Sequence, residues 1–100
     1  MILNKKIIVN GYNYSLIVNY RDAFHEEEFL AKCTDYFYSY DYIVGDIAYG
    51  KLRLKGFYDA GNKKANSINN YALVDDYLKN YCANDCKHFI LKREGVVKDE

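Results

Sequence analysis

Three cations alternate with leucines in the segment 49–58, at the spacing of a β-strand. Single-stranded nucleic acid binds surfaces of this kind, because cations follow its phosphates while aromatic rings stack on its bases. We therefore take the cationic face as a candidate ligand-binding site, with RNA or a ribonucleoprotein as the candidate partner. Period-two alternation assigns to that face Tyr49, Lys51, Arg53, Lys55 and Phe57. The opposite face carries Leu52, Leu54 and Tyr58, of which the two leucines are expected to face the core.

A solvated strand face is the plainer interpretation of the same pattern. Charged residues are the ordinary occupants of exposed strand positions. Three aspartates close by in the sequence, Asp41, Asp46 and Asp59, would neutralise the cations. These carboxylates have the oxygen chemistry for Mg²⁺ or for acid–base work, but turns and strand ends are where Asp is expected anyway. The pattern alone therefore favours structural roles, and ligand binding is a hypothesis about this face.

Sulfur and imidazole groups gather further along the chain. Cys82 and Cys86 flank a predicted helix-to-strand turn, and His88 follows on the last predicted strand. A complete zinc site would need a further ligand, and Cys33 falls on the apolar stripe of a predicted helix instead. We therefore predict reduced, buried thiols with no metal or other cofactor, and a redox disulfide is the alternative.

A catalytic constellation is not evident in the sequence. It contains no phosphate-binding loop, no nucleophile elbow and no dinucleotide fingerprint. No nucleophile, base and orienting group occur at a spacing that names a reaction. The sequence therefore favours a binding protein over an enzyme.

Hydrophobic periodicity and turn residues predict the elements that position these groups. Asn10-Gly11 suits a two-residue type I′ turn between strands at 6–9 and 12–20. In the second of these strands Tyr12, Tyr14, Leu16 and Val18 share one parity, which indicates a single buried face. Further strands are expected at 42–46 and 49–58, joined through 45–48, and at 87–92. Apolar residues at helical spacing predict helices over 26–38 and from about residue 70 to Asn84.

The order strand, strand, helix, strand, strand, helix, strand predicts an α+β domain. We expect a mainly antiparallel sheet of about five strands with both helices covering one face. Residues 1–93 are expected to form the single domain, and residues 94–100 a polar tail that frays.

Composition and charge narrow the class of protein further. The chain has 100 residues, half of them apolar, which indicates one globular domain. Its formal net charge of zero counts against indiscriminate binding to nucleic acid or anionic membranes. No apolar run approaches the roughly 18 residues of a membrane span. Lys5 and Lys6 interrupt the apolar amino terminus, and the cysteine count is odd. These features favour a cytoplasmic protein with no membrane contact.

The residues with the most specific pattern are Tyr40-Asp41-Tyr42-Ile43-Val44-Gly45-Asp46 and the run from Tyr49 to Phe57. In them the chain resembles the YutD-like family of small proteins from low-GC Gram-positive bacteria. The likeness continues more loosely at Phe24, Glu26-Glu27, Asp76-Tyr77-Leu78, Tyr81-Cys82 and Cys86. Because the family has no assigned activity, the resemblance implies a compact cytosolic α+β domain and carries over no catalytic residue.

Two functions remain open at this point. One is a small module that binds RNA or a ribonucleoprotein through the cationic strand face. The other is a protein–protein adaptor without nucleic-acid contact, acting through its tyrosine-rich surface or by adding a strand to an exposed sheet edge. Salt dependence distinguishes them, because phosphate contacts weaken steeply as salt rises.

Overall fold

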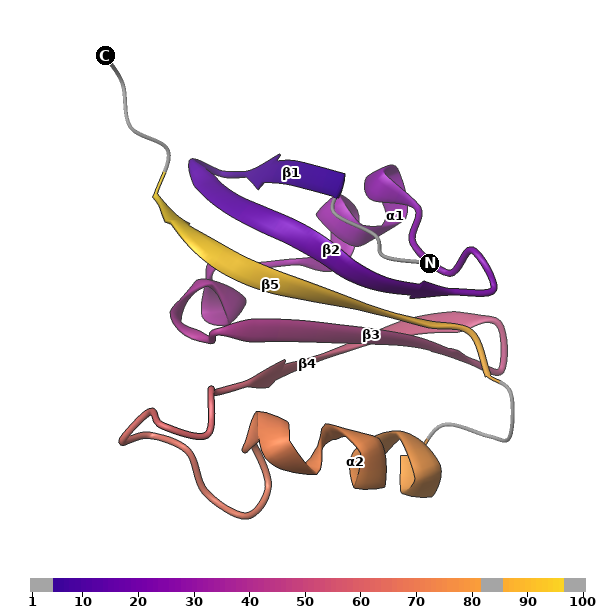
Figure 1. The fold of residues 1–100 in the computed structure, drawn as a ribbon. Coiled ribbons are helices and arrows are strands. Elements are labelled where there is room, and N and C mark those ends of the chain that lie inside the picture. The colour runs from indigo at the N-terminus through magenta and orange to yellow at the C-terminus, as the bar shows by residue number, and fades with distance from the viewer. Residues whose placement is uncertain (1–4, 82–85, 97–100) are drawn as a thin grey trace.

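A computed structural model, which describes residues 5–81 and 86–96, contains one five-stranded sheet (Figure 1). The strands run in the order β1-β2-β5-β3-β4, and every neighbouring pair is antiparallel. The predicted α+β class and strand number are therefore confirmed. The strands are β1 (Lys5–Val9), β2 (Tyr12–Tyr20), β3 (Tyr42–Ala48), β4 (Lys51–Phe57) and β5 (His88–Val96). The helices are α1 (Glu26–Lys32) and α2 (Val74–Tyr81), with 3-10 turns η1 (Asp35–Ser39) and η2 (Tyr71–Leu73).

The two helices cover opposite faces of the sheet. Phe29 of α1 packs into one core with Ile43 of β3 and Phe89 of β5, whereas Val74 of α2 joins a second core with Val44. Figure 1 shows α1 at the upper right, partly behind β1 and β2, and α2 at the bottom, below β4. The expectation that both helices share one face is therefore wrong. The reason lies in β3, where the consecutive residues from Tyr42 to Asp46 are all buried. Because neighbouring residues of a strand point to opposite faces, both faces of the sheet must be covered here.

The hairpin turns follow the chemistry of positive φ angles. Asn10 and Gly11 adopt φ values of 49° and 84°, which confirms the first predicted turn. The second turn is Tyr49-Gly50, with φ values of 54° and 73°, and not the predicted connection through 45–48. Gly45 lies inside β3 opposite Phe89, where a Cβ atom would lie 2.2 Å from the phenyl ring. That glycine is required by close packing and not by a turn.

Two elements depart from simple periodicity. A bulge at Ile17 shifts the register of β2 against β5, so that Leu16 joins the core beneath α1 and Val18 packs on the core beneath α2. The single buried face predicted for Tyr12 to Val18 is therefore wrong beyond the bulge. The first helix ends at Lys32, because Cys33 and Thr34 adopt extended conformations before η1 begins.

The carboxyl-terminal strand is longer than predicted. β5 continues to Val96, three residues into the expected tail, and pairs with β2 over Tyr12↔Val96 and Asn13↔Gly95. Residues 97–100 lie outside the described part of the chain, as does Asn84, the predicted end of the second helix. The start of that helix is close to the prediction, since Asn70 caps η2 by accepting a hydrogen bond from the Ala72 N–H at 2.9 Å.

The Gly45 contact gives a stability prediction. Gly45→Ala should lower the free energy of unfolding by about 1–3 kcal/mol, because the fully buried Phe89 ring cannot move aside without disturbing the core. Chemical denaturation measures the change. Gly61→Ala is the matched control, since its new Cβ meets only the Asp59 carboxylate at 3.4 Å, and it should stay within about 0.5 kcal/mol of wild type. Equal losses in the two variants would contradict the packing role.

Candidate functional site

The candidate face lies on β4, the last strand at one side of the sheet. Leu52 is buried and Leu54 is half-buried against the α1 core, which confirms that these leucines face inward. On the other face Lys51 and Arg53 are exposed, and Lys55 is half-buried. Tyr49 occupies the hairpin turn and is completely exposed. We call these residues, Tyr49, Lys51, Arg53, Lys55 and Phe57, the basic face of β4.

Arg53 is held by a buried carboxylate on the neighbouring strand. The hairpin register places it opposite Asp46. Its Nε donates to Asp46 Oδ1 at 3.1 Å and its terminal nitrogen donates to Oδ2 at 2.7 Å. The Asp46 side chain is 1% exposed and the Arg53 side chain 45% exposed. This bidentate pair raises the pKa of the guanidinium and fixes its plane against the sheet.

Lys55 and Phe57 are drawn towards α2. The Lys55 ammonium lies 5.3 Å from the centre of the Phe57 ring and 5.8 Å from the centre of the Tyr77 ring. Phe57 is 1% exposed and meets Tyr77 edge to face, so its ring is closed to a stacking base. The structure therefore places all five predicted residues on or beside β4, but leaves one of the two expected rings in the core.

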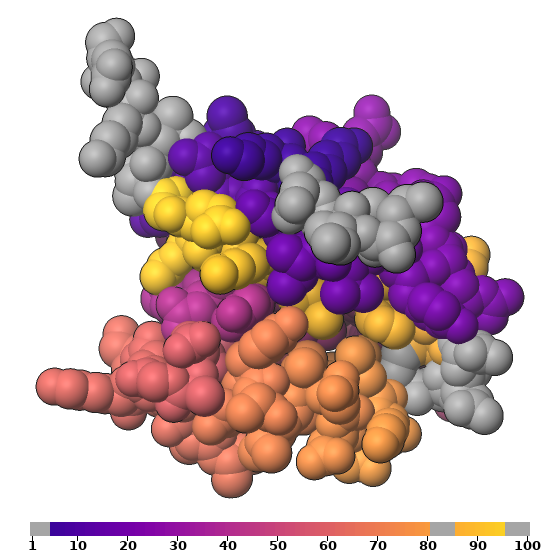
Figure 2. Space-filling view, viewed as in Figure 1, coloured from indigo at the N-terminus to yellow at the C-terminus, as the bar shows by residue number. Residues whose placement is uncertain are grey.

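Two hollows border β4, and Lys55 and Tyr77 line both. The larger, of about 590 Å³, lies between β4, α2 and the loop that precedes η2, with Ile68 and Leu73 exposed at its wall. Figure 2 shows that loop and α2, in salmon to orange, forming the lower part of the molecule's front face. The smaller, of about 380 Å³, lies along β4 from Arg53 to Gly56. Sequence periodicity cannot reveal these hollows, because they depend on where separate elements pack.

A row of tyrosines forms the other wall of the smaller hollow. The Tyr36 and Tyr40 hydroxyls share a hydrogen bond of 2.8 Å, and Tyr40 packs on the Tyr58 ring at 4.6 Å between centres. That hydrogen bond and burial raise the pKa of Tyr40 to about 12. Tyr40 also lies flat against Gly56, where a Cβ atom would come within 2.3 Å of the ring. Tyr40 is therefore in contact with Tyr36, Tyr58 and Gly56, and its hydroxyl stays protonated at physiological pH.

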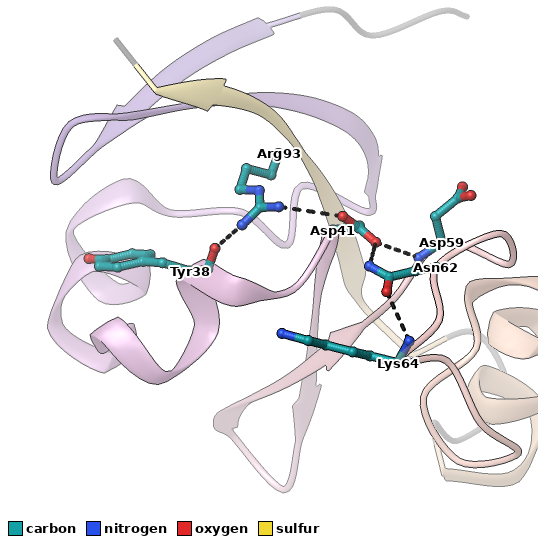
Figure 3. Close-up of polar contacts among 6 residues, drawn as sticks. All are labelled: Tyr38, Asp41, Asp59, Asn62, Lys64 and Arg93. Carbon is teal, nitrogen blue, oxygen red and sulfur yellow. Dashed lines mark hydrogen bonds and ion pairs between the residues drawn. The ribbon is translucent and has the colours of Figure 1, made fainter.

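Asp41 fastens the loop after β4 to the sheet (Figure 3). Its carboxylate accepts hydrogen bonds from the Asp59 N–H at 2.8 Å and from the Asn62 side chain at 3.0 Å, and pairs with Arg93 at 3.5 Å. Arg93 also donates to the backbone carbonyl of Tyr38. Asp59 and Asn62 each accept a hydrogen bond from a backbone N–H two residues further on. The contacts of Asp41, Asp46 and Asp59 are thus the structural ones favoured by the sequence.

Among the described residues, Cys33 does not join Cys86 and His88 in one metal-binding cluster. Cys33 is a free thiol, whereas Cys86 is disulfide-bonded, so the expectation of reduced thiols is wrong for Cys86. Cys82 lies outside the described residues. His88 stacks on Tyr20 at 5.1 Å between ring centres. Within residues 5–81 and 86–96, no three His, Cys, Asp or Glu side chains are grouped to hold a metal ion, and no helix there is long and apolar enough to cross a membrane.

Comparison with known proteins gives consistent matches along the chain. The model of a family described as "Putative antitoxin YutD-like" matches residues 8–92. A protein of Bacillus subtilis (strain 168) named "Putative antitoxin YutD" is 44% identical over 87 residues, which cover 87% of this chain and 96% of that protein. The solution NMR structure of protein yutD from B. subtilis has a TM-score of 0.79 and 40% identity, and covers 96% of this chain and 87% of that one.

The Asp46–Arg53 pair makes Arg53 a structural residue despite its exposure. Arg53→Ala should lower the free energy of unfolding by about 3 kcal/mol, because it leaves the Asp46 carboxylate buried without a counter-ion. Thermal or chemical denaturation measures the loss. The double variant Asp46→Asn/Arg53→Ala should recover a substantial part of it, since no buried charge then remains. A single variant as stable as wild type would contradict this role.

Burial determines the reactivity of Cys33. It raises the pKa of this thiol from 9.0 to about 11, so at pH 8 iodoacetamide should alkylate Cys33 about a hundredfold more slowly in the folded than in the urea-unfolded chain. Mass spectrometry of the Cys33 peptide measures both rates. Because the folded thiol resists ionisation, its effect on stability is constant below pH 9 and becomes unfavourable as the pH rises from about 9 towards 11. Equal alkylation rates would show that the thiol is not protected.

Proposed function

The chain belongs to the YutD-like family, and from this membership and the surface around β4 we propose that it is a protein-binding module that acts as an antitoxin. In this proposal it counteracts a toxin protein by direct contact through the basic face of β4 and the adjoining hollows. The antitoxin role is taken from the name of the B. subtilis relative, and the choice of a protein partner comes from the chemistry of the surface.

Exposed aliphatic side chains beside a cationic strand are the observation that carries the proposal. Ile68 is 71% exposed and Leu73 is 40% exposed, and both line the larger hollow together with Lys55. A concave apolar surface bordered by charge is typical of protein recognition sites. A nucleic-acid site would instead present stacking rings between its cations.

The RNA hypothesis receives less support from the same residues. Phe57 is buried, and the Arg53 guanidinium is already bound on two of its nitrogens by Asp46. Tyr49 is the ring of the basic face that remains fully exposed, next to the exposed Lys51. One ring at a hairpin tip offers a base a single stacking position, with no second ring along the strand.

Capture from a lysate of the organism that encodes the chain tests the proposal. Immobilised wild-type protein should retain a protein partner after ribonuclease treatment, and expression of that partner alone should arrest growth that co-expression of the chain restores. Lys51→Glu/Lys55→Glu should lose both capture and restoration, because the basic face then repels the partner. Lys5→Glu/Lys6→Glu, the same charge change on β1 at the opposite side of the sheet, is the matched control and should keep both.

A nucleic-acid ligand would give a different pattern. Short RNA should then bind the wild type with a log–log salt slope near about −2, at about −0.7 for each of three phosphate contacts. Captured material that disappears on ribonuclease treatment, together with such a slope, would overturn the proposal.

A further inference from the structure

We infer that β4 accepts an extended segment of the partner protein as an additional antiparallel or parallel strand, and that this segment alternates acidic with apolar side chains. The inference rests on the proposed function and specifies how the partner is recognised. It is carried by three observations: the direction of the backbone groups of β4, a contact that the chain makes with itself, and the chemistry of the two walls.

The first observation is that alternate residues of β4 direct their backbone groups away from β3. Lys51 pairs with Ala48 across a two-residue turn, so odd-numbered residues of β4 bond to β3 and even-numbered ones point outward. The backbone N–H and C=O of Leu54 point away from β3. Its side chain, on the face beneath α1, is half exposed and lines the smaller hollow. Among residues 5–81 and 86–96, no backbone hydrogen bond from outside the β3–β4 ladder reaches Leu52 or Leu54, and a strand edge of this kind is a template for another strand.

The second observation is that the chain already uses the continuation of this edge. The outward-pointing Tyr58 donates its N–H to the Asn69 carbonyl at 2.7 Å, and its own carbonyl accepts from the Tyr71 N–H at 2.8 Å. These bonds form a parallel bridge between Tyr58 and Asn70. The edge therefore supports strand pairing immediately beyond Gly56, and the hollow at Arg53–Gly56 is the adjoining stretch.

The third observation concerns the side chains that an added strand would meet. On one face lie Lys51 and Lys55, with the Asp46-bound Arg53 between them, and opposite charges across a strand pair are favourable. On the other face lie Leu54 and the Tyr36 and Tyr40 rings. An incoming strand that matches both faces carries acidic residues at one parity and apolar residues at the other.

A second copy of this chain fits the same edge poorly. Pairing β4 with β4 of another copy in antiparallel fashion would place the cations of one strand opposite those of the other. Like charges directly opposite destabilise a strand pair. The occupant we propose is therefore a segment of a different protein.

Two synthetic peptides with blocked ends test the inference on the full chain. One alternates glutamate with valine, and the other has lysine in place of glutamate. The acidic peptide should bind and slow hydrogen exchange at the Leu54 amide, measured by NMR, while the already bonded Arg53 and Lys55 amides serve as internal references. N-methylation of the acidic peptide at alternate residues can block either the N–H groups that face β4 or those that face away from it. Methylation of the N–H groups that face β4 should abolish binding, because their hydrogen bonds to the β4 edge are lost.

Charge reversal on the chain supplies the matched comparison. Lys51→Glu/Lys55→Glu should weaken binding of the acidic peptide at least about tenfold, whereas Lys5→Glu/Lys6→Glu should not. Three results would each overturn the inference: no binding at the highest soluble peptide concentration, binding without protection of Leu54, or equal binding of the lysine peptide. Protection of Leu54 by short RNA or by self-association would reassign the edge to that occupant. A partner retained by capture despite any of these results would leave the proposed function standing.

Discussion

Burial of β3 on both of its faces is the constraint on which the rest of this small fold depends. A strand with consecutive side chains in two cores needs a cover on each side, and α1 and α2 supply the two covers. The same burial takes Asp46 out of water, so a cation must face it from the next strand. Arg53 therefore has a structural role, although it lies on an exposed, positively charged surface.

Local sequence signals predicted the elements whose causes are local. Asn10-Gly11 specifies its own turn, and the leucines of β4 reveal their face by alternation. Tyr49-Gly50 was missed because Gly45 offered a competing turn signal, although Gly45 is needed by the ring of Phe89, which is distant in sequence. Once the turn is placed at Tyr49-Gly50, the hairpin register pairs Asp46 with Arg53. This contact could therefore have been predicted from the sequence.

The candidate site was predictable in composition but not in shape. Alternation correctly grouped Lys51, Arg53 and Lys55 on one side of a strand. It could not show that α2 closes over Phe57, because that depends on the face to which the helix packs. The bulge at Ile17 is a similar case, since one inserted residue reverses the faces of all that follow in β2. The charge of this surface is thus a local property of the strand, whereas its shape depends on tertiary packing.

The position of β5 in the sheet has a consequence for synthesis on the ribosome. It is the last of the described strands along the chain, yet it lies between β2 and β3, which do not pair with each other. The hairpins β1–β2 and β3–β4 can each form early, but no sheet joins them until β5 has emerged. Until β5 docks between them, the two hairpins therefore expose their inner edges, the edges of β2 and β3.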